Sequence, residues 1–335
     1  MPSAIRFDHP GPPGVLRLVP VERPEPGPDE VRIEVAAAGV NNADLLERRG
    51  QYPVPPDAPP GLGLECAGTI TAVGRDVTDW RPGDQVCALF AGGGYAEEAL
   101  APAAQVMTIP AGLSMVEAAA LPEVACTVYS NLAMIAGLAE GQTVLVHGAG
   151  GGIGSFAIQW AAAIGARVIA TAGSPAKTAA AIELGAMGAV NYREDDFVAA
   201  TLGATDGRGV DAILDVVGAP YLRRNLECLG PDGHLVIIGG SVGPVTLDLG
   251  ALLSRRASIS ATLLRARPAR QKAAIVAGVT RDVLPLVAAG AIRAVVDTVF
   301  PLAEAGRAHE LLESGRTIGK VVLRTRHHQP CVPSP

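Results

Sequence analysis

The feature that most constrains this chain is a run of glycines placed between a short apolar segment and an amphipathic segment. Residues 143–147 (TVLVH) predict a strand, and the residues that follow read GAGGGIG. Residues 155–164 predict a helix, because apolar residues recur there at every fourth position and Gly165 then ends the segment. Glycines at such a junction let the backbone approach a pyrophosphate, and the helix N-terminus offers unpaired N–H groups to the anion. This context predicts a dinucleotide site rather than a flexible turn that binds nothing. The residues assigned to it are Gly148, Gly151, Gly152, Ile153 and Gly154.

The alternation of strands and helices continues beyond the glycine run. Residues 167–171, 211–216 and 234–238 predict strands, and residues 175–184 predict a helix. Strands that alternate with helices are typical of a parallel sheet covered on both faces. The glycine run and this alternation together predict an α/β fold with a Rossmann doubly wound parallel sheet.

The chain on either side of this region has a different texture. Residues 31–37 and 68–73 predict strands, and Pro and Gly turn signals follow them closely, which favours a β-rich barrel or sandwich. Helical segments near 271–286 and 302–313 precede a last strand at 320–324, so we expect the chain to return to this first domain. The predicted division is a β-rich domain at 1–122, a nucleotide-binding domain at 123–262, a return to the first domain at 263–325 and an unstructured tail at 326–335.

The segment after the second predicted strand indicates which dinucleotide is bound. NAD enzymes usually place a carboxylate there to hold the ribose 2′-hydroxyl, and residues 171–177 contain none. They contain Ser174 and Lys177 instead, which suit a 2′-phosphate, and Tyr192 and Arg193 can close the same pocket. Alternatively, Ser174 only caps the next helix and Lys177 is solvated, but capping and phosphate contact are compatible. We therefore predict NADPH as the cofactor.

Composition removes several classes of protein. The formal net charge of -6 and a pI near 5.6 argue against a nucleic-acid partner, which normally requires a basic surplus. We expect no signal peptide and no membrane span, because the N-terminus lacks an apolar core and the apolar stretches are interrupted. The five cysteines are scattered without C-x-x-C spacing, which predicts a cytoplasmic protein without disulfides.

Several short motifs, in the same order along the chain, resemble the zinc-free quinone oxidoreductase branch of the medium-chain dehydrogenases/reductases. The resemblance covers about residues 1–325 and looks closest to the inducible mammalian quinone oxidoreductase subgroup. It implies a GroES-like catalytic domain beside the Rossmann domain. The motifs that carry it are GVNNAD at 39–44, GQYP at 50–53, GLGLE at 61–65, the glycine run, AGS at 172–174 with Lys177, and Asn191-Tyr192.

The same resemblance argues against a metal. Zinc-dependent relatives carry two cysteines and a histidine at positions that match Asn41, Leu64 and Glu123 here. The cysteine-rich lobe of those relatives is also missing between residues 90 and 106. Without a Lewis acid, oxidation of an alcohol is disfavoured and reduction of an electron-poor acceptor is favoured. We interpret Glu65 as a buried residue bonded to the structure.

The resemblance also implies a set of residues around the cofactor and acceptor. Asn41 and Tyr52 are the catalytic candidates near the nicotinamide, although Tyr52 is equally well a packing aromatic. Thr127 matches a residue that touches the nicotinamide carboxamide, and Gly148 stands where this branch often has Ala. Gly173 is assigned to the cofactor beside Ser174. Backbone contacts around the ring and the ribose are assigned to Gly239, Gly240, Ser241, Leu263, Leu264 and Arg265.

Three functions follow from the resemblance. The first is reduction of quinones by hydride or electron transfer from NADPH. The second is an enoyl or 2-alkenal reductase in which Tyr52 donates the proton to carbon. The third is a non-enzymatic NADPH-binding protein. The resemblance also implies a homodimer joined through residues 257–264 (ASISATLL), the alternative being a strand whose edge a loop covers.

Overall fold

The computed structural model describes residues 1–325, and the chain divides into two compact units. The first unit contains Met1–Val124, Arg265–Ala288 and the described residues from Ala294 onward. The second unit contains Ala125–Leu264 and Ala289–Arg293. The predicted domain boundaries lie at 122/123 and 262/263. The units of the structure divide at 124/125 and 264/265, two residues later in each case. The predicted tail at 326–335 lies outside the described residues.

The second unit is built on a six-stranded parallel sheet. Its strands lie side by side in the order β10-β9-β8-β11-β12-β13. Counted along the chain, this is third, second, first, fourth, fifth and sixth, the order of a doubly wound nucleotide-binding sheet. The topological switch lies between β8 and β11, which confirms the predicted fold class. The strands are β8 (Thr143–His147), β9 (Arg167–Ala172), β10 (Gly188–Asn191), β11 (Val210–Asp215), β12 (Leu229–Ile237) and β13 (Ser258–Ala261).

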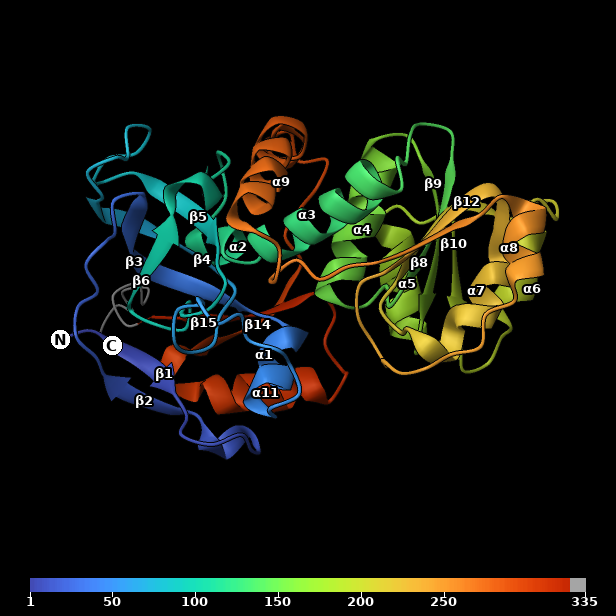
Figure 1. Cartoon of the computed structure of the whole chain (residues 1–335). Coiled ribbons are helices and arrows are strands. Elements are labelled where there is room, and N and C mark those ends of the chain that lie inside the picture. The colour runs from blue at the N-terminus through green and yellow to red at the C-terminus, as the bar shows by residue number, and fades with distance from the viewer. Residues whose placement is uncertain (326–335) are drawn as a thin grey trace, which may run out of the picture. The chain divides into compact units, whose positions relative to one another are not determined.

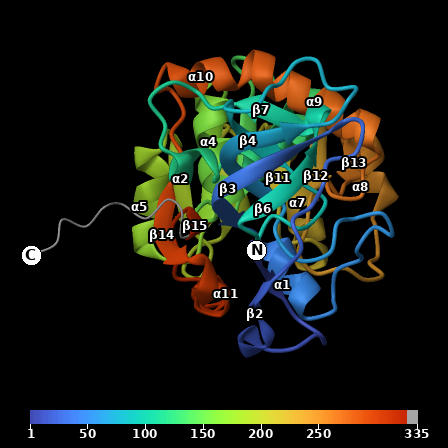
Figure 2. The ribbon, with the colours of Figure 1, turned by 90° about the vertical axis from the view of Figure 1, so that its left-hand side faces the viewer.

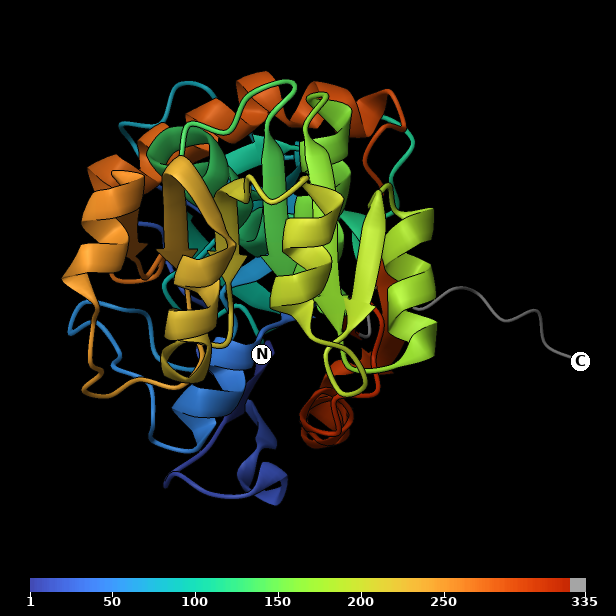
Figure 3. The ribbon, with the colours of Figure 1, turned by 90° about the vertical axis from the view of Figure 1, so that its right-hand side faces the viewer.

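Helices cover both faces of this sheet. α4 and α5 lie on one side, and α6, α7 and α8 lie on the other, as Figure 1 shows, and Figure 3 looks onto the same unit. The helical elements are α3 (Pro122–Val128), the π-helix η3 (Tyr129–Ile135), α4 (Gly152–Ala163), α5 (Pro175–Glu183), α6 (Phe197–Ala204), η4 (Ala219–Tyr221), α7 (Leu222–Cys228) and α8 (Leu249–Arg255).

The beginning of α4 differs from the prediction. The sequence predicts a start at residue 155, whereas the helix begins at Gly152 and includes Gly154. Glycine is a poor helix former, but here its missing side chain is required by packing. A Cβ at Gly154 would lie 2.3 Å from the carbonyl oxygen of Gly148. The first turn of α4 therefore packs directly on the backbone of the glycine loop.

Four adjacent strands supply one buried apolar row of the second unit. Leu145 pairs in register with Ile169 on one side and with Ile213 on the other, and Ile213 pairs with Leu235. All four side chains are 0–1% exposed and belong to one core cluster. Burying an aliphatic side chain of this size stabilises a fold by roughly 1.5–3 kcal/mol, so this row holds the sheet together.

The first unit is built on a seven-stranded sheet around one long strand. β3 pairs antiparallel with β4, with β6 and, near its end, with β15, and Figure 2 faces this unit. The last strand of the chain therefore completes the first sheet. Its strands are β3 (Glu30–Val40), β4 (Glu65–Val73), β5 (Gln85–Leu89), β6 (Glu98–Pro102), β7 (Val106–Thr108), β14 (Val296–Pro301) and β15 (Lys320–Arg324), and a separate pair is β1 (Ser3–Arg6) with β2 (Arg17–Pro20).

Short helices connect these strands. The predicted helix at 271–286 is wrong as one element, because it divides at Val283 into α9 and α10. Pro285 explains the division, since proline has no N–H for the helix and its ring clashes with the preceding turn. The helical elements are η1 (Pro13–Val15), α1 (Asn42–Arg48), η2 (Ala103–Gln105), α2 (Met115–Ala118), α9 (Ala269–Asp282), α10 (Leu284–Ala288), η5 (Leu302–Glu304) and α11 (Ala305–Glu313).

Among residues 1–325, one stretch, Met115–Ile135, which contains α2, α3 and η3, is long and apolar enough to span a bilayer by length and composition alone. Within the protein, 78% of its most apolar window is buried. Burial of this kind is the property of a core helix.

We predict that Gly154→Ala lowers the free energy of unfolding by about 1–3 kcal/mol, because the added Cβ forces α4 away from the glycine loop. Gly203→Ala is the matched control, since Gly203 also lies in a helix of the second unit and its Cβ meets nothing within 4 Å. The control should be neutral or stabilising by up to about 1 kcal/mol. Urea unfolding of both variants measures this, and equal effects would contradict the packing role of Gly154.

Candidate active site

The pairing of three strands brings Asn41, Glu65 and Lys320 together. In the β3–β15 pair, Val40 is opposite Val321, so Asn41 and Lys320 are the next residues at the same end. In the β3–β4 pair, Ala38 is opposite Cys66, which places Glu65 beside Gly39. A Cβ on Gly39 would lie 2.2 Å from Oε1 of Glu65, so glycine at this position makes room for the carboxylate.

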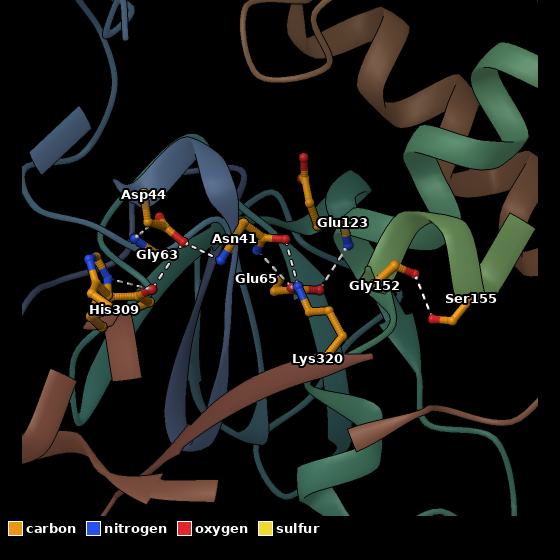
Figure 4. Close-up of polar contacts among 10 residues, drawn as sticks. Asn41, Asp44, Gly63, Glu65, Glu123, Gly152, Ser155, His309 and Lys320 are labelled. Atoms are coloured by element: carbon orange, nitrogen blue, oxygen red, sulfur yellow. Dashed lines mark hydrogen bonds and ion pairs between the residues drawn. The ribbon is translucent and has the colours of Figure 1, made fainter. Parts of the chain in front are cut away.

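The three side chains form a closed set of hydrogen bonds (Figure 4). Lys320 Nζ donates to Oε1 of Glu65 and to Oδ1 of Asn41, each at 2.6 Å. Asn41 Nδ2 donates to the same Glu65 oxygen at 2.8 Å, and the backbone N–H of Glu123 donates to its Oε2 at 2.9 Å. The side chains of Lys320 and Glu65 are 6% and 0% exposed. The interpretation of Glu65 as a buried residue bonded to the structure is confirmed.

A buried aspartate fixes the backbone on the other side of Asn41. Asn41 is the N-cap of α1, and its backbone N–H donates to Oδ2 of Asp44 at 2.8 Å. Asp44 also accepts from the N–H of Gly63 and from the hydroxyl of Tyr95, each at 3.0 Å. Burial raises the pKa of Asp44 to about 6, although these hydrogen bonds oppose the shift. The GVNNAD motif therefore builds the start of α1 and holds Asn41 from both its backbone and its side chain.

Zinc-dependent relatives hold their metal at the positions that match Asn41, Leu64 and Glu123. The side chains that this protein has there do not fit zinc. Leu64 is buried and offers no donor atom, and Asn41 offers a neutral amide oxygen that already accepts from the Lys320 ammonium. A cation therefore already occupies the place beside Glu65. Zinc in proteins is held by thiolate, imidazole and carboxylate ligands, and within residues 1–325 no three or more such side chains are grouped to hold a metal.

Tyr52, the other catalytic candidate, lies in the loop after α1 and is half-buried. Burial, with the nearby Glu123 carboxyl, raises the pKa of Tyr52 to about 12. The phenol therefore keeps its proton at neutral pH and can act as a hydrogen-bond donor. The Arg265 guanidinium lies 5.6 Å from the centre of the Tyr52 ring.

The side chain of Arg265 lies in the first unit, although only a backbone contact to the cofactor was predicted for this residue. It forms a buried ion pair with Glu47 and donates from Nε to the carbonyl oxygen of Ala91 at 2.6 Å. Its carbonyl oxygen accepts from Lys272 Nζ at 3.3 Å. Sequence reasoning missed this role, because no local motif links residues so far apart in the chain.

Glu123 has an unusual protonation state. Burial and the neighbouring Glu65 carboxylate raise the pKa of Glu123 to about 8, while Lys320 and Arg265 oppose the rise. Its carboxyl group is therefore mostly neutral at pH 7. The sequence predicted this position only as one that has lost a zinc ligand.

In the second unit, the glycine loop has the conformation that a dinucleotide requires. Gly148 has φ of +73°, which favours glycine, and Gly151 is the N-cap of α4. Gly152, Ile153 and Gly154 form the first turn of the helix, where N–H groups have no intrahelical acceptor. This loop fits the pyrophosphate of NADPH, because unpaired donors and the positive end of the helix dipole gather there.

The residues predicted to select NADPH converge beside this loop. Ser174 caps α5 by accepting from the N–H of Lys177 at 3.4 Å, so the capping role is confirmed. A Cβ on Gly150 would lie 2.5 Å from Cδ of Lys177, and a Cβ on Gly173 would lie 2.5 Å from the Tyr192 hydroxyl. Lys177 in α5 therefore lies against the glycine loop, and Tyr192 after β10 lies against Gly173; side chains of these types can bind a ribose 2′-phosphate.

The remaining predicted contacts lie along the same unit. Gly240 has φ of +94°, and Ser241 is bound to the segment after β11 by its N–H and its carbonyl oxygen. The buried Thr127 accepts at its carbonyl oxygen from Asn131 Nδ2 at 2.8 Å. Gly239 follows β12, Leu264 is buried and Leu263 is 44% exposed. Contacts of these residues with NADPH stay predictions.

The fold and the site define a class: a dinucleotide-dependent oxidoreductase with a GroES-like unit and without the ligands of catalytic zinc. Comparison with known proteins agrees. Residues 27–111 match the model of the alcohol dehydrogenase GroES-like domain, and residues 184–323 match that of the zinc-binding dehydrogenases. The chain is 36% identical over 325 residues to a quinone oxidoreductase of Pseudomonas aeruginosa, covering 96% of this chain and 99% of that protein.

Solved structures give the same result. Escherichia coli quinone oxidoreductase complexed with NADPH superimposes with a TM-score of 0.85 at 34% identity, covering 96% of this chain and 99% of that one. The CurK enoyl reductase superimposes with a TM-score of 0.86 at 30% identity, covering 97% and 99%. The chain belongs to the quinone oxidoreductase family of the medium-chain dehydrogenases/reductases. It is therefore an NADPH-dependent oxidoreductase, which confirms the predicted cofactor class.

We predict that Lys320→Met lowers the free energy of unfolding by about 3–5 kcal/mol, because it leaves the buried Glu65 carboxylate without its cation. Arg223→Met is the matched control, since it removes an ion pair to Glu227 whose side chains are 91% and 44% exposed. That control should cost less than about 1 kcal/mol. Denaturant titration compares the two, and adding Glu65→Gln to Lys320→Met should recover much of the loss. Similar costs for the two single variants would contradict the structural role of Lys320.

Proposed function

We propose that this protein reduces quinones with NADPH. The observation that carries the proposal is the Lys320 ammonium, which takes the place of a metal beside Asn41 and Glu65. An acceptor here must take up a hydride without Lewis-acid activation at these residues. Quinones meet this requirement, because their reduced form is stabilised by aromatic delocalisation. The quinone oxidoreductases among the relatives support the same substrate class.

The residues of the first unit would assist the transfer by hydrogen bonding. Bound NADPH supplies the hydride, and the protein orients the reactants. Tyr52 keeps its proton at neutral pH, so its hydroxyl can donate to the quinone oxygen on which negative charge develops. Asn41 has one N–H directed to Glu65, and its second N–H can serve the same purpose. Lys320 and Glu65 position Asn41 and touch no reacting atom.

The residues of the second unit would hold the cofactor. We place the pyrophosphate on the glycine loop and the 2′-phosphate among Ser174, Lys177 and Tyr192. Thr127, residues 239–241 and residues 263–265 would face the nicotinamide half. The positions of Lys177 against Gly150 and of Tyr192 against Gly173 support this orientation, because a cation and a hydroxyl group can both bind a phosphate.

The second candidate function is reduction of enones, which needs a proton on carbon as well as a hydride. The Tyr52 phenol, which keeps its proton at neutral pH, favours it, because its hydroxyl can donate that proton to carbon. The similarity to an enoyl reductase also supports it. The third alternative, a non-enzymatic NADPH-binding protein, is disfavoured by membership of an enzyme family.

We predict that Tyr52→Phe separates the two reactions. Enone reduction should fall by about 10²-fold or more, since it loses its proton donor. Quinone reduction should fall by less than about 10-fold, because its protons come from water after the transfer. Steady-state oxidation of NADPH with a 1,4-quinone and with a 2-alkenal measures both rates on the same preparation. Equal losses for the two acceptors would contradict a role for Tyr52 as proton donor in enone reduction alone.

We also propose that two chains associate through β13, as the sequence predicted for residues 257–264. β13 is the last strand of its sheet and pairs with β12 on one side. The neighbouring segment exposes apolar side chains, with Val242 92%, Leu249 64% and Leu253 78% exposed. An unpaired edge flanked by exposed apolar residues favours pairing with a second copy.

Sedimentation equilibrium of the purified protein at micromolar concentration tests the association. We expect the mass of two chains, because pairing of the edges buries backbone groups and apolar side chains together. Leu253→Glu should shift the mass toward one chain. Ile182→Glu, which changes an exposed apolar residue of α5 beside the opposite edge strand β10, should leave it unchanged. A single-chain mass for the unaltered protein would refute the proposal. A cytoplasmic location stays a prediction from the cysteine pattern.

A further inference from the structure

A buried histidine lies directly before the glycine loop. His147 is the last residue of β8 and is 0% exposed. Its Nδ1 lies 2.8 Å from Oγ1 of Thr171, and its Nε2 lies 2.8 Å from Oδ1 of Asn225. Phe197 and Tyr221 contact its ring edge-on, with ring centres 5.0 and 5.1 Å away. The ring is therefore fixed in position and hydrogen-bonded at both nitrogens.

The direction of every hydrogen bond in this set follows from Asp215. Oδ1 of Asp215 accepts from the N–H groups of Val217 and Gly218, and Oδ2 accepts from Asn225 Nδ2 at 3.0 Å. Because the amide nitrogen of Asn225 faces Asp215, its oxygen faces the histidine and must accept. His147 therefore carries its proton on Nε2, and Nδ1 accepts from the Thr171 hydroxyl.

The surroundings keep this histidine neutral. Burial lowers the pKa of His147 to about 4, the hydrogen bond to Asn225 opposes the shift, and the Arg224 cation adds to it. Arg224 lies over the Phe197 ring at 3.9 Å. The carboxylate of Asp215 accepts hydrogen bonds from Asn225 and from backbone N–H groups. It is connected to the His147 ring only through the Asn225 amide. One tautomer thus persists across the working pH range.

The bonded set connects the loops that follow three neighbouring strands. His147 precedes the glycine loop, and Thr171 lies at the end of β9, before Gly173 and Ser174. Asp215 ends β11, and the next residues bind Ser241, since Ser241 N–H donates to Val217 O at 2.9 Å. NADPH is assigned to the first two of these loops and to Ser241, which the third loop binds. A displacement of His147 would shift them relative to one another.

We propose that His147 is a positioning residue that sets the preference for NADPH over NADH, by holding the Ser174 loop at a fixed place relative to the glycine loop. The proposal rests on the placement of NADPH proposed above. Both cofactors use the glycine loop, whereas only NADPH carries the 2′-phosphate that the Ser174 loop would contact. A change in the spacing of the two loops therefore changes the affinity for NADPH more than the affinity for NADH, and so alters the ratio of the two.

The test compares two replacements of His147. His147→Phe keeps a ring of similar size and removes both polar atoms, so Thr171 and Asn225 lose their partner. His147→Gln keeps one acceptor and one donor. Dissociation constants for NADPH and NADH come from fluorescence titration of the full chain, and the melting temperature is measured on the same samples. We expect the preference for NADPH to fall about tenfold or more in His147→Phe and to recover in large part in His147→Gln.

Two further variants serve as controls. Lys177→Met removes the proposed direct phosphate contact and should lower the preference by itself. Thr205→Val removes a buried hydroxyl of the same unit, which donates to Thr201 O at 2.8 Å and accepts from Gly209 N–H at 3.0 Å, outside the His147 set. It should lower the melting temperature with an unchanged preference. If His147→Phe does not fold, Thr171→Val removes only one hydroxyl of the set and is expected to lower the preference in the same direction.

The outcomes separate the two proposals. An unchanged preference in folded His147→Phe, or an equal fall in Thr205→Val, overturns the positioning role alone. If the unaltered protein binds NADH as tightly as NADPH, the placement of the 2′-phosphate fails and the role of His147 fails with it. A fall in His147→Phe with recovery in His147→Gln supports both.

Discussion

The buried ion pair between Lys320 and Glu65 is the interaction on which the catalytic unit depends. Moving two charges out of water costs several kcal/mol each, and only a complete set of partners offsets that cost. Glu65 has that set, because its two oxygens accept from Lys320, from Asn41 and from the backbone N–H of Glu123. One carboxylate thus connects strands β3, β4 and β15 with the start of α3. The orientation of Asn41 follows from it, and the Glu65 carboxylate adds to the effect of burial in raising the pKa of Glu123.

In the second unit, buried hydrogen bonds, and not an ion pair, connect neighbouring elements. A chain of hydrogen bonds runs from Thr171 through His147 and Asn225 to Asp215. The two units therefore fix their loops by different means. The first unit uses the buried ion pair, and the second uses a chain of hydrogen bonds whose donor and acceptor directions are set by the Asp215 carboxylate.

The nucleotide-binding fold was predictable because its signals are local. The strand, glycines and helix at 143–164 lie in one continuous segment, and Ser174 caps α5 where the sequence indicates. Lys320 was not predictable as a partner of Asn41, since the two meet only through the register of strands 279 residues apart. The buried side chain of Arg265 was missed for the same reason. The division of the helix at Val283 was missed although Pro285 signals it, because the apolar periodicity continues across the break.

The order of the strands along the chain has a consequence for biosynthesis. Glu65 is made 255 residues before its lysine partner, a delay of about 10–50 s at ribosomal rates of translation. During that interval β3 has no β15 beside it, and its second half presents unpaired backbone to the surroundings. The residues of the nucleotide unit, Ala125–Leu264, are nearly continuous and emerge within this time. The nascent chain can thus complete its cofactor-binding half first, and the catalytic centre assembles only when the last strand leaves the ribosome.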